Sequence, residues 1–259
     1  KRKRKDAMSE AVSIPEAAAL LLEQKRILIL THERPDGDAI GSSFGMREFL
    51  RQCCGCEAEV VLPAPPPERY QELIGEYKTT LTPEEVAQYD LILLLDCANC
   101  ERIACGPAVD PVSLPELSRP PMLNVDHHKG NNVNARWNVV MPQIAAASQV
   151  AAGNGMGEKA GRPLPERAAT FWLLGIVTDT GAFRFSNTLS NTLRVTADLL
   201  DCGANLECVV NAAYYSKPLN QQKFEAELLE TQEKLAFDGR YIYAYIPDEL
   251  FAKYDFVSS

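Results

Sequence analysis

The chain has 259 residues, 46% of them hydrophobic and 24% charged, which is typical of a folded globular protein. Its net charge is −9 although the first five residues, KRKRK, are all basic, so the rest of the chain is more acidic still. Such a charge excludes tight binding of long nucleic acid, which depends on clustered Lys and Arg. No apolar run is long enough to span a membrane and no secretory signal is visible, so we expect a cytoplasmic protein with no membrane partner.

The eight cysteines do not form a regular framework of disulfides or metal ligands. Disulfide frameworks are typical of short secreted chains, so reduced thiols are expected in this one. The clusters CCGC (53–56) and CANC (97–100) are irregularly spaced and have no histidine near them. A structural zinc site is therefore only a minor alternative.

The first half of the chain alternates between segments of helical and of strand character. A basic N-terminus, 1–12, is expected to be disordered. Ser13 and Glu16 stand at the spacing of a capping box, which predicts that a helix begins there. Uninterrupted apolar runs, above all LILLL, predict buried strands. The further elements predicted are strand 26–31, helix 39–53, strand 57–63, short helix 68–75 and strand 90–97.

The second half continues this alternation and ends in a different kind of segment. Strand 122–128 is followed by helices at 144–152, 165–177 and 190–201, and the whole pattern predicts an α/β fold with a doubly wound, mostly parallel sheet. A long helix, 217–237, and a strand, 240–246, then follow, and the strand is expected to begin a second domain. We therefore divide the chain into a main domain at 13–212, a linker helix at 213–237 and the first strand of an incomplete domain at 238–259.

Side chains of the kinds that bind metals follow three of the predicted strands. Because ligands bind at the carboxyl ends of strands in parallel α/β sheets, these groups should converge in one crevice. The chain has only three histidines, and all three lie in these segments. Carboxylates mixed with imidazole suit Mn²⁺ or a similar divalent ion better than a thiolate zinc site does. The residues are His32, Asp36 and Asp38, then Asp96, then Asp126, His127 and His128, and the segment FWLLGIVTDTGAFRF adds Asp179 and Arg184.

Asp36 and Asp38 are separated only by Gly37. In extended backbone alternate residues point to the same side, but Gly37 can bend the chain and fan the two carboxylates apart, one toward each of two metals. The helix from Ala39 onward would then direct its first amides toward the crevice, where phosphate oxygens could bind. A simpler alternative is that Asp38 only caps this helix.

Four segments resemble, in order and approximate spacing, the four motifs of the DHH phosphoesterase family: HERPDGDAIGSS, LLLDCAN, NVDHHKGNN and GIVTDTGAFRFSNT. The resemblance is strongest to the bifunctional oligoribonuclease and pAp phosphatase (NrnA-like) subfamily, and it covers about residues 14–246. It implies a DHH catalytic domain, a linker helix and the start of a DHH-associated domain. The Gly-rich motif of that second domain ends in a histidine, and no histidine follows His128 here.

The resemblance also implies a centre of two Mn²⁺ ions that share one carboxylate. Asp96 would bridge the ions, so both would lose a ligand if it were removed. The implied ligands are His32, Asp36 and Asp96 for one ion, and Asp38, Asp96, His127 and Asp179 for the other.

Three further residues receive implied roles around the ions. His128 would act as a catalytic residue together with Asp96 and would touch the substrate phosphate. Asp126 would orient a histidine from behind. Arg184 would contact phosphate, with a plain surface residue as the alternative interpretation.

The implied activity is the Mn-dependent hydrolysis of phosphoesters by a two-metal-activated water. The expected substrates are short oligoribonucleotides, cleaved to mononucleotides, and pAp, which would lose its 3′-phosphate. Hydrolysis of cyclic di-AMP or pApA is an alternative with the same motifs. A second alternative is a non-catalytic metal-binding scaffold, and the oligomeric state stays open, with a homodimer as one option.

Overall fold

A computed structural model describes residues 9–117, 119–153 and 164–254 of the chain. The predicted disordered N-terminus lies mostly outside these residues, but Glu10–Ala11, within it, form a short strand, β1. Two compact units make up the chain, Lys1–Ala213 and Tyr214–Ser259. No helix in the described ranges is long and apolar enough to cross a membrane.

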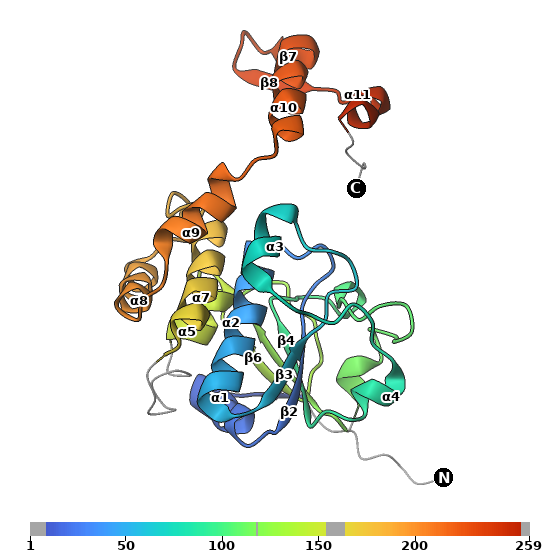
Figure 1. The fold of residues 1–259 in the computed structure, drawn as a ribbon, viewed down its shortest axis with the longest axis vertical. Coiled ribbons are helices and arrows are strands. Elements are labelled where there is room, and N and C mark those ends of the chain that lie inside the picture. Colours follow the sequence, from blue (N-terminus) through green and yellow to red (C-terminus); the bar gives the residue numbers. More distant parts are fainter. Residues whose placement is uncertain (1–8, 118, 154–163, 255–259) are drawn as a thin grey trace. The chain divides into compact units, whose positions relative to one another are not determined.

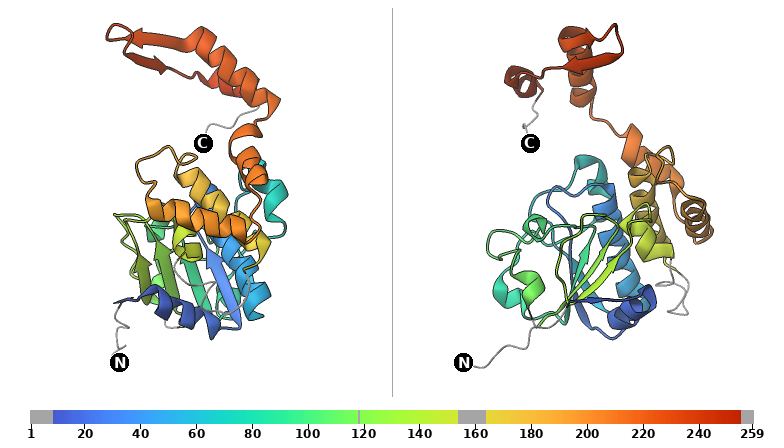
Figure 2. Two further views of the ribbon diagram at one scale, coloured as in Figure 1. Left: turned by 90° about the vertical axis from the view of Figure 1, so that its left-hand side faces the viewer. Right: turned by 180° about the vertical axis from the view of Figure 1, so that it is seen from behind.

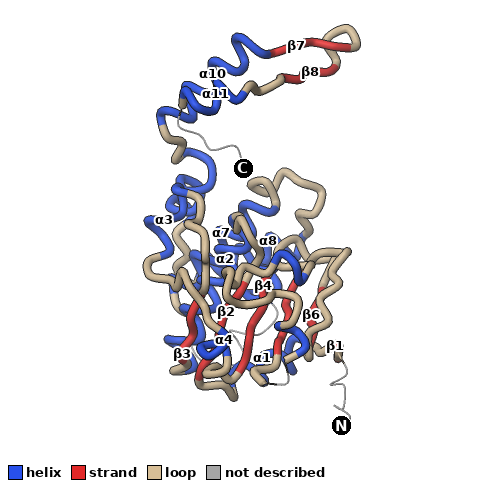
Figure 3. The backbone as a smooth tube through the Cα atoms, turned by 90° about the vertical axis from the view of Figure 1, so that its right-hand side faces the viewer, coloured by secondary structure: helices blue, strands red, loops and turns tan. Residues whose placement is uncertain are grey.

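The first unit is built on one sheet of six parallel strands (Figures 1 and 3). Their order across the sheet is β1-β6-β5-β4-β2-β3, which confirms the predicted α/β fold with a parallel sheet. The central strand, β4, is buried at every residue, as its uninterrupted run of leucine and isoleucine requires when both faces are covered. The strands after β1 are β2 (Arg26–Leu30), β3 (Glu57–Val60), β4 (Leu91–Leu95), β5 (Met122–Asp126) and β6 (Trp137–Val140).

Helices and long connections cover the two faces of this sheet. Helix α2 contacts β2 and β4 on one face, and α5 and α7 pack beside it (Figure 2). On the other face, Leu30 and Leu94 pack in a core with Ile103 and Leu114 from the connection between β4 and β5. The helices are α1 (Ile14–Leu22), α2 (Gly37–Cys54), α3 (Glu68–Ile74), α4 (Pro83–Val86), α5 (Ala147–Gly153), α7 (Glu166–Asp179), α8 (Ser190–Asp201) and α9 (Leu206–Val210), with short 3₁₀ turns at Cys100–Arg102 and Leu114–Glu116 and a π-helical turn at Asn211–Tyr215.

Helices α2 and α7 approach each other closely because glycines face each other across their contact. A Cβ atom at Gly41 would lie 2.5 Å from the carbonyl oxygen of Phe171 and 2.7 Å from the backbone nitrogen of Gly175. At Gly37 it would overlap the side chain of Thr178. This contact brings the first turn of α2 beside the last turn of α7.

The start of α2 differs from the prediction in a way that matters for the site. The helix begins at Gly37, and its N-cap is Asp36, whose Oδ1 accepts hydrogen bonds from the backbone N–H groups of Asp38 (3.0 Å) and Ala39 (3.1 Å). The first amides are therefore already bound by a side chain, so the expectation that they would hold phosphate is wrong. Gly37 serves close packing against α7 and not a bend in extended backbone.

The second unit contains α10 (Leu219–Gln232), a hairpin of β7 (Glu233–Ala236) and β8 (Tyr241–Ala244), and α11 (Asp248–Lys253). The helix predicted at 217–237 thus ends at Gln232, because the residues that follow pair antiparallel with β8. The strand predicted at 240–246 is accordingly the second strand of this unit and not its first.

Candidate metal centre

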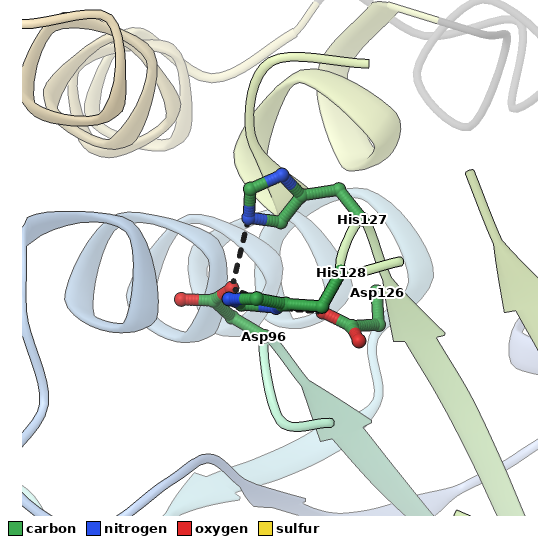
Figure 4. A group of neighbouring side chains, drawn as sticks. All are labelled: Asp96, Asp126, His127 and His128. Atoms are coloured by element: carbon green, nitrogen blue, oxygen red, sulfur yellow. Dashed lines mark hydrogen bonds and ion pairs between the residues drawn. The ribbon is translucent and has the colours of Figure 1, made fainter. Parts of the chain in front are cut away.

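The predicted metal ligands meet at the carboxyl edge of the sheet, where three parallel strands end together. Asp96 directly follows β4, His127 follows β5, and His32 lies two residues after β2. Asp38 comes from the first turn of α2, and Asp179 is the last residue of α7. In Figure 4 the rings of His127 and His128 both approach Asp96, and His128 lies between Asp96 and Asp126.

His32, Asp36 and Asp96 form the first group of side chains that could hold a cation. His32 Nε2 lies 3.9 Å from Asp36 Oδ1 and 3.7 Å from Asp96 Oδ2. The other ring nitrogen, Nδ1, lies 2.6 Å from the carbonyl oxygen of Glu33 and must donate to it, because a carbonyl only accepts. This bond fixes the tautomer and leaves Nε2 facing the carboxylates.

Asp38, His127 and Asp179 form the second group. His127 Nε2 lies 3.4 Å from an Asp179 oxygen and 3.8 Å from Asp38 Oδ2. The fully buried Asp38 side chain is held by the backbone N–H groups of Ala147 (2.5 Å) and Ser148 (2.9 Å), one to each oxygen. The position of this carboxylate is therefore fixed before any ligand arrives.

Asp96 lies between the two groups and presents one oxygen to each. Its Oδ2 is the atom near His32, whereas Oδ1 lies 3.4 Å from His127 Nε2. Oδ1 is buried and accepts no hydrogen bond from the described residues, so its near partners are the rings of His127 and, at 3.7 Å, His128. A buried carboxylate oxygen without a hydrogen bond is costly. The backbone φ of Asp96 is 53°, a conformation that few residues other than glycine adopt and that is frequent at functional sites. Oxygen and imidazole donors of this kind fit a hard or borderline divalent cation.

A third group of side chains, His128, Asp126 and Asn131, lies next to Asp96. His128 Nδ1 donates to Asp126 Oδ1 over 2.8 Å, and Nε2 of the half-exposed ring makes no hydrogen bond or ion pair with the described residues. Asn131 Nδ2 donates to Asp126 Oδ2 over 2.6 Å and to the carbonyl oxygen of Cys97 over 3.3 Å. Asn131 thus ties the loop of His128 to the loop of Asp96. The sequence prediction missed this residue, although it lies within the quoted segment NVDHHKGNN.

The electrostatics of the cluster keep its histidines protonated when only protein groups are present. Burial lowers the pKa of His32 and of His127, but the surrounding carboxylates outweigh it and raise these values to about 10 and about 9. Burial, together with the charge of Asp96, raises the pKa of Asp179 to about 6 despite the opposing effect of His127. Cations entering the cluster would have to displace these protons.

Arg184 lies on the turn that follows α7, five residues after Asp179. Gly181, Ala182 and Phe183 all have positive φ values, between 56° and 64°, and return the chain so that the Arg184 amide donates to the carbonyl of Thr180. The Arg184 side chain is exposed, and its Nε donates to the carbonyl of Gly181 over 2.8 Å. No hydrogen bond or ion pair joins it to the cluster within the described residues, so its contact with phosphate stays a prediction.

The cysteines take no part in the centre. None of the eight forms a disulfide, and none belongs to a candidate cation group in the described ranges. Burial raises the pKa of Cys97 to about 12 and that of Cys105 to about 11, which keeps both as thiols.

Several known proteins are similar to this chain in sequence. The NrnA bifunctional oligoribonuclease and PAP phosphatase of Thermus thermophilus is 32% identical over 229 residues, covering 88% of this chain and 65% of that protein. The proteins of the same name from Mycoplasma pneumoniae and Bacillus subtilis are 31% and 28% identical, and each is covered over 58% of its length. The chain spans about three fifths of the length of these relatives.

Solved structures support the fold. An exopolyphosphatase-related protein from Bacteroides fragilis superimposes with a TM-score of 0.80 at 20% identity, covering 94% of this chain and 72% of the other. A putative family II inorganic pyrophosphatase from Methanococcus jannaschii gives 0.52 at 17% identity, over 83% of this chain and 69% of the other. The model of the DHH family, N-terminal domain, matches residues 26–176, more than half of the chain. With that match, and with the quoted motifs gathered at one edge of a parallel sheet, the chain belongs to the DHH family.

Proposed function

We propose that this protein is a phosphoesterase with two Mn²⁺ ions that hydrolyses short oligoribonucleotides to mononucleotides and removes the 3′-phosphate of pAp. The observation that carries the proposal is the position of Asp96, with Oδ2 3.7 Å from His32 and Oδ1 3.4 Å from His127. A carboxylate placed in this way, buried and without a hydrogen bond to Oδ1, suits a bridge between two cations.

The ligands proposed for each ion are those that the geometry groups together. His32, Asp36 and Asp96 would hold one, and the donor set suits Mn²⁺ because it mixes imidazole with carboxylates and contains no thiolate. When bound, such a pair of ions supplies an activated water and neutralises charge on the phosphoryl oxygens. The second set is Asp38, His127 and Asp179, completed by Asp96.

The remaining roles belong to the protein's own side chains. The Nδ1–H group of His128 donates a hydrogen bond to Asp126. The other nitrogen, Nε2, can therefore hold a proton for the leaving oxygen or donate a hydrogen bond to the phosphate. The hydrogen bond with Asp126 raises the pKa of His128, which favours the protonated form. Asp126 positions the ring, and Arg184 is assigned to the phosphate.

The substrate class rests on the relatives and on the charge of the chain. The relatives named above are described as oligoribonucleases and PAP phosphatases, and a net charge of −9 suits short substrates better than polymers. We assign Tyr214–Ser259 to the start of the DHH-associated domain.

Product analysis by chromatography tests the proposal. The 259-residue chain is incubated with Mn²⁺ and, separately, pAp, pApA, cyclic di-AMP or pyrophosphate, beside Asp96→Asn and, as a control, Asp198→Asn at an exposed position of α8. We expect turnover of pAp and pApA by the wild type and the control and none by Asp96→Asn. Turnover of cyclic di-AMP alone would redirect the function to that substrate. Two bound Mn²⁺ with no turnover would support the scaffold alternative.

A further inference from the structure

A cavity of about 800 Å³ borders the loop that carries His32 and Asp36. Its volume lies within the range of about 300–1,000 Å³ that is typical of small-molecule sites. Three segments line it: residues 33–35 between those two proposed ligands, residues 62–64 after β3, and residues 103–111 in the connection between β4 and β5. All three belong to the first unit.

The wall of this cavity is hydrogen-bonded directly to the backbone around His32. Ile103 pairs with His32 in an isolated antiparallel bridge. The amide of Glu33 donates to the carbonyl of Arg102 over 2.7 Å, and the amide of Ala104 donates to the carbonyl of Thr31 over 2.8 Å. The cavity therefore lies beside the backbone that carries His32, a ligand proposed for the first cation.

The lining suits a flat, weakly polar ring. Apart from Glu33, Arg34 and Asp110, the lining residues are apolar or small, and they include Pro35 and Pro63. Arg34 is exposed, has a φ of 53°, and makes no ion pair or hydrogen bond with the described residues. A planar guanidinium of this kind stacks on nucleobases and pairs with phosphate.

We propose that this cavity is a second nucleotide subsite, which takes the base and sugar on one side of the phosphodiester bound at the cluster. Arg34 contacts the base or the phosphate of that nucleotide. The inference rests on the proposed function and deepens it, because it assigns a place to the second nucleotide of a short oligoribonucleotide.

Equilibrium binding tests the subsite without catalysis. Adenosine 5′-monophosphate is titrated into the full chain in the presence of EDTA, so that the cations and turnover do not contribute. Ala108→Trp places a large ring in the cavity, and Ala19→Trp, at an exposed position of α1, is the matched control. We expect Ala108→Trp to weaken binding at least tenfold, Arg34→Gln to weaken it severalfold, and Ala19→Trp to leave it unchanged. No binding by the wild type, or equal binding by Ala108→Trp, would overturn the inference.

Turnover separates this inference from the proposed function. The ratio of kcat/KM for pApA to that for methyl p-nitrophenyl phosphate, a small diester with no nucleoside, should fall at least tenfold in Ala108→Trp and stay constant in Ala19→Trp. Nucleotide binding that depends on Ala108 without turnover of pApA or pAp would leave the subsite standing and refute the proposed function. An unchanged ratio with active enzyme would refute the subsite alone.

Discussion

The contact between α2 and α7 makes Gly41→Ala a sharp test of how the centre is assembled. The new Cβ would lie 2.5 Å and 2.7 Å from backbone atoms of α7, whereas ordinary contacts begin at 3.4 Å. The two helices must therefore separate by about 1 Å, because backbone atoms in a packed interior cannot turn aside as the tip of a flexible side chain can.

The sign of the stability change distinguishes this argument from simple helix propensity. Replacing glycine by alanine within a helix stabilises it by about 1 kcal/mol when nothing is in the way. Overpacking costs about 1–3 kcal/mol, so we expect Gly41→Ala to lower the free energy of unfolding by as much as about 2 kcal/mol. Urea denaturation measures this difference.

The same shift should impair the centre, because Asp38 and Asp179 come from the two helices that separate. Metal–ligand distances hold within about 0.2 Å, so a displacement of about 1 Å weakens Mn²⁺ binding. Misplacement on this scale costs about 100-fold in turnover. Mn²⁺ titration and kcat/KM for pAp provide the measurements.

Gly130→Ala is the control for stability, because a Cβ there would meet nothing within 4 Å and its φ is not positive. We expect its free energy of unfolding to be equal to or slightly above that of the wild type. A Gly41→Ala protein that is more stable than the wild type, with unchanged Mn²⁺ affinity, would refute the packing argument.

Three further predictions concern the charges and hydrogen bonds of the cluster. The folded-state pKa values of His32 and His127 are about 10 and about 9, above the ordinary value of 6.5. The protonated rings therefore contribute their full stability below pH 6.5, and this contribution is lost as the pH rises through the folded-state pKa values. Urea denaturation in EDTA should therefore show a falling free energy of unfolding between pH 7 and pH 10, and an equal slope in a His32→Gln, His127→Gln variant would contradict this. Binding of both Mn²⁺ ions at pH 7.5 should release about two protons. Calorimetry in two buffers of different ionisation enthalpy measures this number, and a binding enthalpy that is the same in both buffers would contradict the prediction. Asn131→Ala removes the Nδ2 group that donates to Asp126 over 2.6 Å. We expect kcat to fall about 10–100-fold and its pH profile to change, with little change in Mn²⁺ affinity. An unaltered kcat and pH profile would show that Asn131 only supports the loop.

The sequence predicted the sheet and the gathering of the ligand-type residues well, for a physical reason. Strands buried on both faces must be apolar throughout, so LILLL and its neighbours were evident, and parallel strands place their carboxyl ends together. Strand β6 was missed because Trp137–Val140 is only partly buried and neither alternates nor forms an apolar run.

Features that depend on contacts distant in sequence were not predictable in the same way. The residues after Gln232 continue a helical pattern, and only pairing with Tyr241–Ala244 turns them into a strand. The sequence offered only Asp38 as an alternative cap for α2, whereas Asp36 is the cap, and the role of Asn131 required the distance to Asp126. The cavity beside His32 is formed by three separate segments, and no local pattern marks it.

The close packing of α2 on α7 also sets the order in which this centre can form as the chain is made. Strands β2 and β4 leave the ribosome early, and Asp38 and Asp96 leave with them, but Asp179 is at the end of a helix that follows the whole sheet. Domains fold as their sequence emerges, N-terminal parts first. The carboxylates of the early segments therefore lack Asp179 until α7 has been made. A nascent chain interrupted before Asp179 has the parallel sheet edge but not the complete cluster. Completion of the centre is thus a late event of biosynthesis, and it reports that α7 has docked on α2.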